Sequence, residues 1–125
     1  MNENRKFAQV GRFIYEFQRV RATLAGLYQM LADGETPQLG LADLASRTAA
    51  LFAQRRAADA VAVSGFHAVI EAVQEYAARL DELLAQVDLD NVPEEDEIQS
   101  LLSCQHELER YQRLLASMPD DATAP

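Results

Sequence analysis

The chain has 125 residues, of which 49% are hydrophobic and 25% charged, and its formal net charge is −9. This length suffices for one domain with a continuous core, and the composition is that of a soluble globular protein. Because an excess of carboxylates is repelled by nucleic-acid phosphates and by anionic lipid, neither nucleic acid nor a membrane is expected as a partner.

The negative charge is concentrated in the second half of the chain. Residues 1–60 carry eight basic and six acidic side chains, whereas residues 61–125 carry three basic and fourteen acidic ones. This asymmetry favours another protein with a basic or apolar surface as the partner. The single cysteine, Cys104, excludes an intramolecular disulfide. The N-terminal sequence lacks a signal-peptide pattern and no long apolar run follows, so the bacterial cytoplasm is the expected compartment.

The first segment is predicted to be a helix over residues 4–33. Apolar side chains recur there at spacings of three and four, which is typical of a helix with a buried face. Gly34 and Pro37 follow as stop signals. The apolar face is wider than one neighbouring helix requires, and we therefore expect it also to support a homodimer.

The second segment, residues 41–57, is also predicted to be a helix, but its junction with the third segment is ambiguous. Ser64 and Gly65 could break the chain there or lie within one kinked helix. Asp59 and Ser64 are both suitable N-caps. We favour a break between residues 58 and 65, with a single kinked helix as the alternative.

The third and fourth segments, residues 60–87 and 94–117, share a strict heptad-like alternation of apolar positions. Two such segments joined by a short loop predict an antiparallel coiled-coil hairpin. The predicted fold class is therefore all-α, a four-helix bundle-like single domain over residues 1–118 that dimerisation can complete. Residues 119–125 are expected to form a flexible C-terminal tail.

The stretch VDLDNVPEEDE, residues 87–97, holds six carboxylates between these two helices. Asp88 and Asp90 match the start of an EF-hand loop, but Val92, Pro93 and Gln99 occupy positions where calcium binding needs oxygen ligands or glycine. The pattern is better explained by the start of a helix, since acidic residues near the N-terminus interact favourably with the helix dipole. Four consecutive acids exceed what a cap requires. We call them the acidic tip, Glu94, Glu95, Asp96 and Glu97, and treat it as a candidate docking site.

Basic residues line one edge of the first helix. Arg5, Arg12 and Arg19 repeat every seven residues, which places them on one side of the helix. This edge is either a solvated flank or the surface that meets the acidic tip, within one chain or across a dimer.

No constellation of residues predicts catalysis, a metal site or a cofactor. His106 is expected on the outer face of its helix and Cys104 in the buried seam. Histidine phosphotransfer is disfavoured at His67, because Glu71 lies four residues on and would repel a phosphoryl group. Arg79 is expected to pair with Glu75 at i,i+4 as an ordinary surface pair.

The favoured hypothesis is therefore a non-enzymatic regulator or chaperone-like adaptor that binds another protein, a class that includes anti-activators and immunity proteins. Its expected contacts are the acidic tip, the basic edge and an apolar face of the first helix that includes Phe13 and Phe17. The alternative is a structural oligomerisation module whose apolar surface is consumed by self-association.

Overall fold

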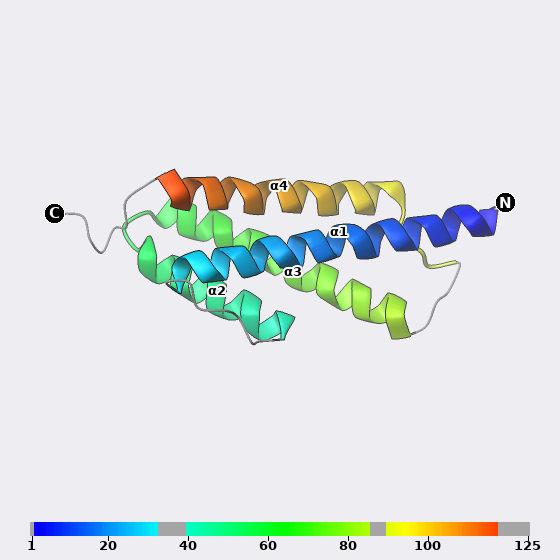
Figure 1. The fold of residues 1–125 in the computed structure, drawn as a ribbon, viewed down its shortest axis with the longest axis horizontal. Coiled ribbons are helices and arrows are strands. Elements are labelled where there is room, and N and C mark those ends of the chain that lie inside the picture. The colour runs from blue at the N-terminus through cyan, green and yellow to red at the C-terminus, as the bar shows by residue number, and fades with distance from the viewer. Residues whose placement is uncertain (1, 33–39, 86–89, 118–125) are drawn as a thin grey trace.

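The computed structural model describes residues 2–32, 40–85 and 90–117, and across these residues it is an all-helical bundle (Figure 1). The helices are α1 (Asn2–Leu31), α2 (Leu41–Arg55), α3 (Ala60–Ala85) and α4 (Glu95–Ser117). Their bounds lie within two residues of those expected from the apolar spacing. The predicted tail at residues 119–125, like the residues at 33 and 86–87 that were expected to be helical, lies outside the described ranges.

Three of the four helices run in the same direction, and α3 runs against them (Figure 1). The last turns of α1 and α2 lie together, since Arg55 Nη2 donates to the carbonyl oxygen of Leu31 at 2.9 Å. The start of α4 lies beside the first half of α1 rather than beside its end. α3 is antiparallel to α4, as the hairpin model expects, but the most extensive contact of α4 is with α1.

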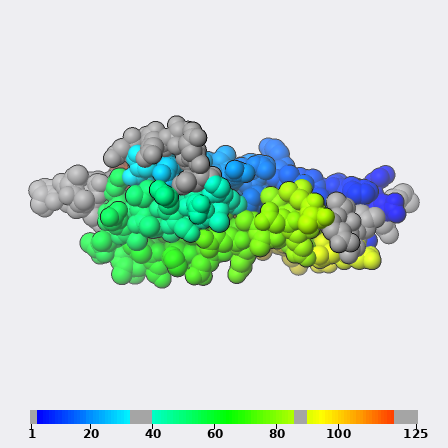
Figure 2. All heavy atoms as spheres, turned by 90° about the horizontal axis from the view of Figure 1, so that it is seen from below, coloured from blue at the N-terminus to red at the C-terminus, as the bar shows by residue number. Residues whose placement is uncertain are grey.

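The helices differ in length, so the number of helices that pack together changes along the axis of the bundle. α2 has 15 residues, against 30 in α1 and 26 in α3. It covers only one end of the molecule. Beyond the first turn of α2, towards the N-terminus of α1, atoms of α1 are visible beside α3 (Figure 2). Among the described helices, the half of the bundle that contains the N-terminus of α1 is therefore built from α1, α3 and α4.

The core of the four-helix end is an aromatic cluster. The rings of Phe52 and Phe66 stack with centroids 4.2 Å apart, and Tyr111 packs edge-on against both, at 5.4 and 5.0 Å. Gly65 allows this packing, because a Cβ at that position would lie 2.7 Å from the Tyr111 hydroxyl oxygen. The glycine that the sequence offered as a helix breaker therefore lies within α3 and makes room for an α4 side chain.

The break between α2 and α3 occurs at residues 56–59, which begins before the expected range of 58–65 and overlaps only its start. Asp59 caps α3: its Oδ1 accepts a hydrogen bond from the backbone N–H of Ala62 at 3.0 Å, and its carbonyl oxygen accepts one from Val63. A carboxylate at this position satisfies an N–H that would otherwise lack a partner at the helix start. Of the two candidate caps, Asp59 is the one used, and Ser64 is helical.

Polar side chains fix the register between α1 and α4. Gln105 Nε2 donates to Thr23 Oγ1 at 2.8 Å, and Gln112 Nε2 donates to the carbonyl oxygen of Thr23 at 3.2 Å. Gln105 is 4% exposed, although its polarity gave no reason to predict a core position. Because a buried amide that loses its partner costs about 1–3 kcal/mol, sliding α4 along α1 would be penalised.

Candidate functional site

The basic edge of α1 and the acidic tip meet within one chain. Arg12 Nη1 donates to Glu95 Oε2 at 2.7 Å, and Lys6 Nζ lies 3.9 Å from Asp90 Oδ1. The parallel arrangement of α1 and α4 produces this contact, because it places the start of α4 beside the first turns of α1. The basic edge could be a solvated flank or the surface that meets the acidic tip. The described contacts include a meeting with the acidic tip, within one chain.

The electrostatics of Glu95 follow from this contact. The hydrogen bond from Arg12 holds the pKa of the Glu95 carboxyl below its ordinary value, and a second hydrogen bond, from the Gln99 amide at 3.0 Å, acts in the same direction. Desolvation opposes both effects, and the charges of Arg12 and Arg5 add to the lowering of the pKa. Glu95 therefore remains ionised as an internal partner of α1.

A second acid of the tip is bound by α3. Arg79 Nε donates to Glu97 Oε1 at 2.7 Å, and Arg79 Nη2 donates to the carbonyl oxygen of Asn91 at 2.9 Å. Glu82 lies 3.7 Å from the same guanidinium. The expected pairing of Arg79 with Glu75 is thus wrong: the planar guanidinium instead joins α3 to the start of α4, where it satisfies a carboxylate and a backbone carbonyl together.

The remaining acids of the tip are Glu94 and Asp96. Both side chains are exposed, and neither forms an ion pair within the described parts of the chain. Of the four acids proposed for docking, Glu95 and Glu97 are ion-paired within the chain, whereas these two have no ion-pair partner among the described residues. The structure also leaves Arg5 exposed, while Arg19 Nη1 bonds to Glu16 Oε2 at 3.0 Å on its own helix.

The proposed apolar contacts Phe13 and Phe17 require a correction. They are 0% and 2% exposed, and their rings stack with centroids 6.5 Å apart inside the bundle. Phe13 also meets Tyr76 of α3 edge-on at 6.4 Å. Periodicity placed both residues correctly on the apolar face of α1, but that face is covered by the chain's own helices and is not presented to a partner.

The histidines lie on the surface. His106 is exposed on α4, and His67 is exposed on α3 with Nε2 3.5 Å from Glu71 Oε1. Cys104 is buried, and burial raises the pKa of its thiol to about 11, so that it stays protonated at neutral pH. Within residues 2–32, 40–85 and 90–117, no group of three or more His, Cys, Asp or Glu side chains is arranged to hold a metal ion.

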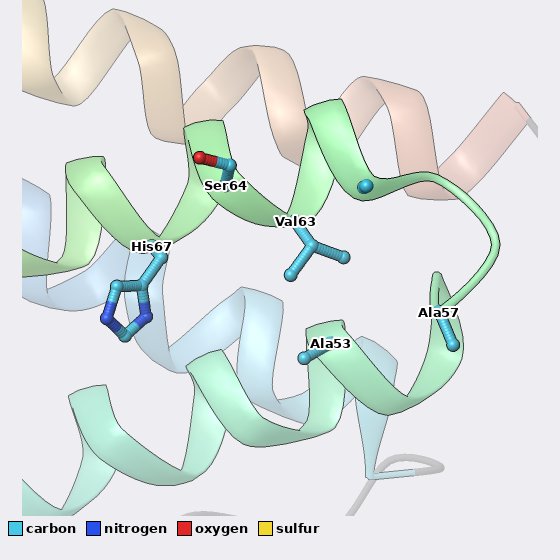
Figure 3. A pocket seen from close by; sticks show the side chains of 6 residues that line it. Ala53, Ala57, Val63, Ser64 and His67 are labelled. Carbon is cyan, nitrogen blue, oxygen red and sulfur yellow. The ribbon is translucent and has the colours of Figure 1, made fainter.

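An open hollow separates the end of α2 from the start of α3 (Figure 3). It has a volume of about 440 Å³ and is lined by Ala53, Ala57, Ala60, Val63, Ser64 and His67. Val63 of α3 and Ala53 of α2 face each other across it in Figure 3. The lining is mostly apolar because four of its six residues are alanine or valine. The hollow stays open because these side chains are small and lie where two helices diverge from their connecting turn.

Sequence reasoning missed this hollow. The signal was present in AADAVAV, residues 57–63, a run of small residues at a helix junction where larger apolar residues would have closed the gap. Ser64, His67 and Glu71 lie in order along one face of α3 beside it, which superficially suggests nucleophilic chemistry. However, no hydrogen bond joins Ser64 to the His67 ring in the described structure, and both His67 and Glu71 are about two-thirds exposed. A nucleophile needs a base within hydrogen-bond reach, so this row does not form a catalytic set.

No described helix combines the length and the apolar character needed to cross a membrane. Comparison of the chain with protein-family models, with curated proteins and with solved structures finds no match.

Proposed function

We propose that this protein acts by binding another protein, as a regulatory or chaperone-like adaptor without catalytic activity, and that the partner is held at the hollow between α2 and α3. The observation that carries this proposal is the hollow itself, which is open and mostly apolar. Val61, at the same corner, is 84% exposed. Apolar surface of this kind is a typical anchor point in protein interfaces.

The size of the hollow indicates what it accepts. Its lining consists mainly of alanine methyl groups and one valine, which leaves room for a large apolar or aromatic side chain. Burying such a side chain contributes about 1.5–3 kcal/mol, which is the scale of a single interface hot spot. The partner's anchor is therefore a bulky apolar residue rather than a charged one.

The charge beside the hollow further restricts the partner. Glu71 lies next to His67 of its lining, and Glu75 and Glu82 continue this acidic row along the exposed side of α3, away from the hollow. The acidic tip, where Glu94 and Asp96 are exposed, has the same sign but lies at the opposite end of the bundle (Figure 1). A partner with lysine or arginine beside its apolar anchor is therefore favoured, because complementary charges accelerate association and exclude acidic competitors.

The proposal is tested by filling the hollow. The wild-type protein is used to capture partners from a lysate of the source organism, and a captured protein is then purified and titrated calorimetrically. Ala57→Trp places an indole in the hollow and should raise the dissociation constant at least about tenfold, which corresponds to the loss of about 1.4 kcal/mol.

Ala58→Trp is the matched control. Ala58 is exposed in the same turn but does not line the hollow, so this variant should bind as the wild type does. Equal affinity of the wild type and Ala57→Trp, or equal loss in both variants, would contradict a docking site in the hollow.

A structural oligomerisation module remains the second candidate function. It is favoured by α1, where Phe7 and Tyr15 are 53% and 64% exposed on the side that faces away from the core. Recovery of nothing but copies of the same chain from the lysate would favour this candidate over the adaptor.

A further inference from the structure

The side of α1 that faces away from the core carries an uncharged row, which we call the outer face. Its members succeed one another at spacings of three, four, four and three residues, and all are exposed. They are Asn4, Phe7, Gly11, Tyr15 and Gln18. The exposed side of an amphipathic helix normally carries its charged residues, so an uncharged row with two exposed aromatic rings indicates a surface that is covered in use.

Gly11 at the centre of the row is not explained by the fold. A glycine in a helix interior is destabilising relative to alanine, because it loses more conformational freedom on folding. Gly26 and Gly65 have an internal reason, because a Cβ would lie 2.8 Å from Gln112 Nε2 and 2.7 Å from the Tyr111 hydroxyl oxygen, respectively. At Gly11, nothing lies within 4 Å of the position that a Cβ would take. The glycine is thus suited to the close approach of something outside the chain.

The outer face is symmetric about Gly11, and this identifies the occupant. Phe7 and Tyr15 lie four residues to either side, and Asn4 and Gln18 lie seven residues to either side. A two-fold axis requires that residue i contact residue j while j contacts i. Two copies of α1 that cross in opposite directions at Gly11 would meet this condition, with aromatic rings opposite aromatic rings and carboxamides opposite carboxamides.

The charges beside the outer face permit two copies to approach. A chain with a net charge of −9 repels itself, and the acidic row of α3 makes that side unsuitable for contact. Along the outer face, in contrast, Arg12 is neutralised by Glu95 and Arg19 by Glu16. Two α1 helices can therefore meet without bringing unpaired like charges from these positions together.

We infer that the outer face of α1 is the interface between two copies of this chain, packed antiparallel with Gly11 at the crossing point. Phe7 of each copy lies against Tyr15 of the other, and Asn4 against Gln18. The spacing of four residues on both sides of the crossing matches the common helix packing in which rows of residues i and i+4 interdigitate. One crossed helix pair is smaller than a standard stable interface, so the dimer dissociates on dilution.

The test is the mass in solution by light scattering across a dilution series. The wild type should approach twice the 13.9 kDa of one chain at high concentration and return towards 13.9 kDa on dilution. Gly11→Arg places a long side chain at the crossing point and should raise the dimer dissociation constant at least about tenfold. Circular dichroism should show unchanged helicity, since open space surrounds this position in the single chain.

Leu84→Arg is the matched control, because Leu84 is 64% exposed on α3, away from the outer face. It should leave the dimer dissociation constant unchanged. A wild-type chain that is monomeric at every concentration would overturn the inference, as would a dimer that is insensitive to Gly11→Arg or equally sensitive to Leu84→Arg. None of these outcomes affects the hollow between α2 and α3, because a partner can bind there whether the chain is a monomer or a dimer.

Discussion

Arg12 on α1 and Glu95 on the first turn of α4 form a hydrogen-bonded ion pair, with Nη1 and Oε2 2.7 Å apart, although 83 positions separate them in the chain. The pair joins the two features that stand out in the sequence, the basic edge and the acidic tip. Because the acidic tip is partly occupied by its own chain, it is a weaker candidate for an independent docking site than the sequence suggests.

The ion pair predicts how Glu95 titrates. In the wild type, the Glu95 pKa lies below the ordinary glutamate value because Arg12 and Gln99 hydrogen-bond to the ionised carboxylate. Arg12→Gln should move the Glu95 pKa upwards, and Arg19→Gln should leave it unchanged. A depressed carboxyl pKa contributes stability above the ordinary pKa, and this contribution is lost as the pH falls through the folded-state value. Carboxyl-detected NMR titration measures the shift, and an unmoved Glu95 resonance in Arg12→Gln would show that the pair does not form.

Two glycines should respond to alanine in opposite directions. Gly65→Ala should lower the free energy of unfolding, because the new Cβ collides with Tyr111 in the aromatic cluster. Overpacking costs about 1–3 kcal/mol, partly offset by about 1 kcal/mol of helix propensity. Gly11→Ala should raise the free energy of unfolding by about 0.5–1 kcal/mol, since that position is open. Urea denaturation of dilute protein measures both, and equal signs would contradict the packing at Gly65.

The hydrophobic seam of α4 makes a prediction about core stability. Leu108 is fully buried, so Leu108→Ala should lower the free energy of unfolding by about 2–5 kcal/mol through lost burial and a residual cavity. The exposed Leu84 provides the comparison, because Leu84→Ala should change stability by no more than about 0.5 kcal/mol. Similar urea midpoints for the two variants would be incompatible with this bundle.

The buried thiol predicts a loss of stability in alkaline solution. Burial raises the Cys104 pKa to about 11, whereas the thiol of an unfolded chain has a pKa of about 8.5. The stabilising contribution of the protonated thiol is complete below the unfolded pKa and declines as the pH rises from there towards 11. Cys104→Ala should therefore lose less stability than the wild type over this interval, measured by urea denaturation at several pH values. Parallel curves for the two proteins would show that the thiol is not buried.

The sequence predicted the parts of the fold that depend on local pattern. Apolar spacing located four helices and placed Cys104 in a buried seam and Phe13 and Phe17 on an apolar helix face, and the structure has all three buried. It could not indicate that α4 packs most extensively on α1, because an apolar face can pack against any of several other apolar faces. Polar contacts between particular residues determine which two helices pack together. The bond between Gln105 and Thr23 is of that kind, and it joins residues 82 positions apart.

The candidate sites were predicted less completely, for a related reason. Periodicity shows that Phe13 and Phe17 share an apolar face, but it does not show which neighbour covers that face. The hollow between α2 and α3 arises from the angle at which two helices leave a turn, which no local pattern encodes. The sequence places Gly11 in a helix between Phe7 and Tyr15, but only the packing of the helices shows that Gly26 and Gly65 have internal contacts that Gly11 lacks.

The pairing of copies through α1 is tested most directly by disulfide formation between single cysteines. In a Cys104→Ala background, Phe7→Cys and Tyr15→Cys proteins are mixed and oxidised, and the covalent species are separated under denaturing conditions. From equal amounts of the two proteins, the account predicts that the mixed disulfide between position 7 of one chain and position 15 of the other exceeds each symmetric disulfide by much more than the roughly twofold excess of random pairing, because the antiparallel crossing places these positions opposite each other. Random pairing, or preferential 7–7 and 15–15 disulfides, would contradict the antiparallel crossing at Gly11.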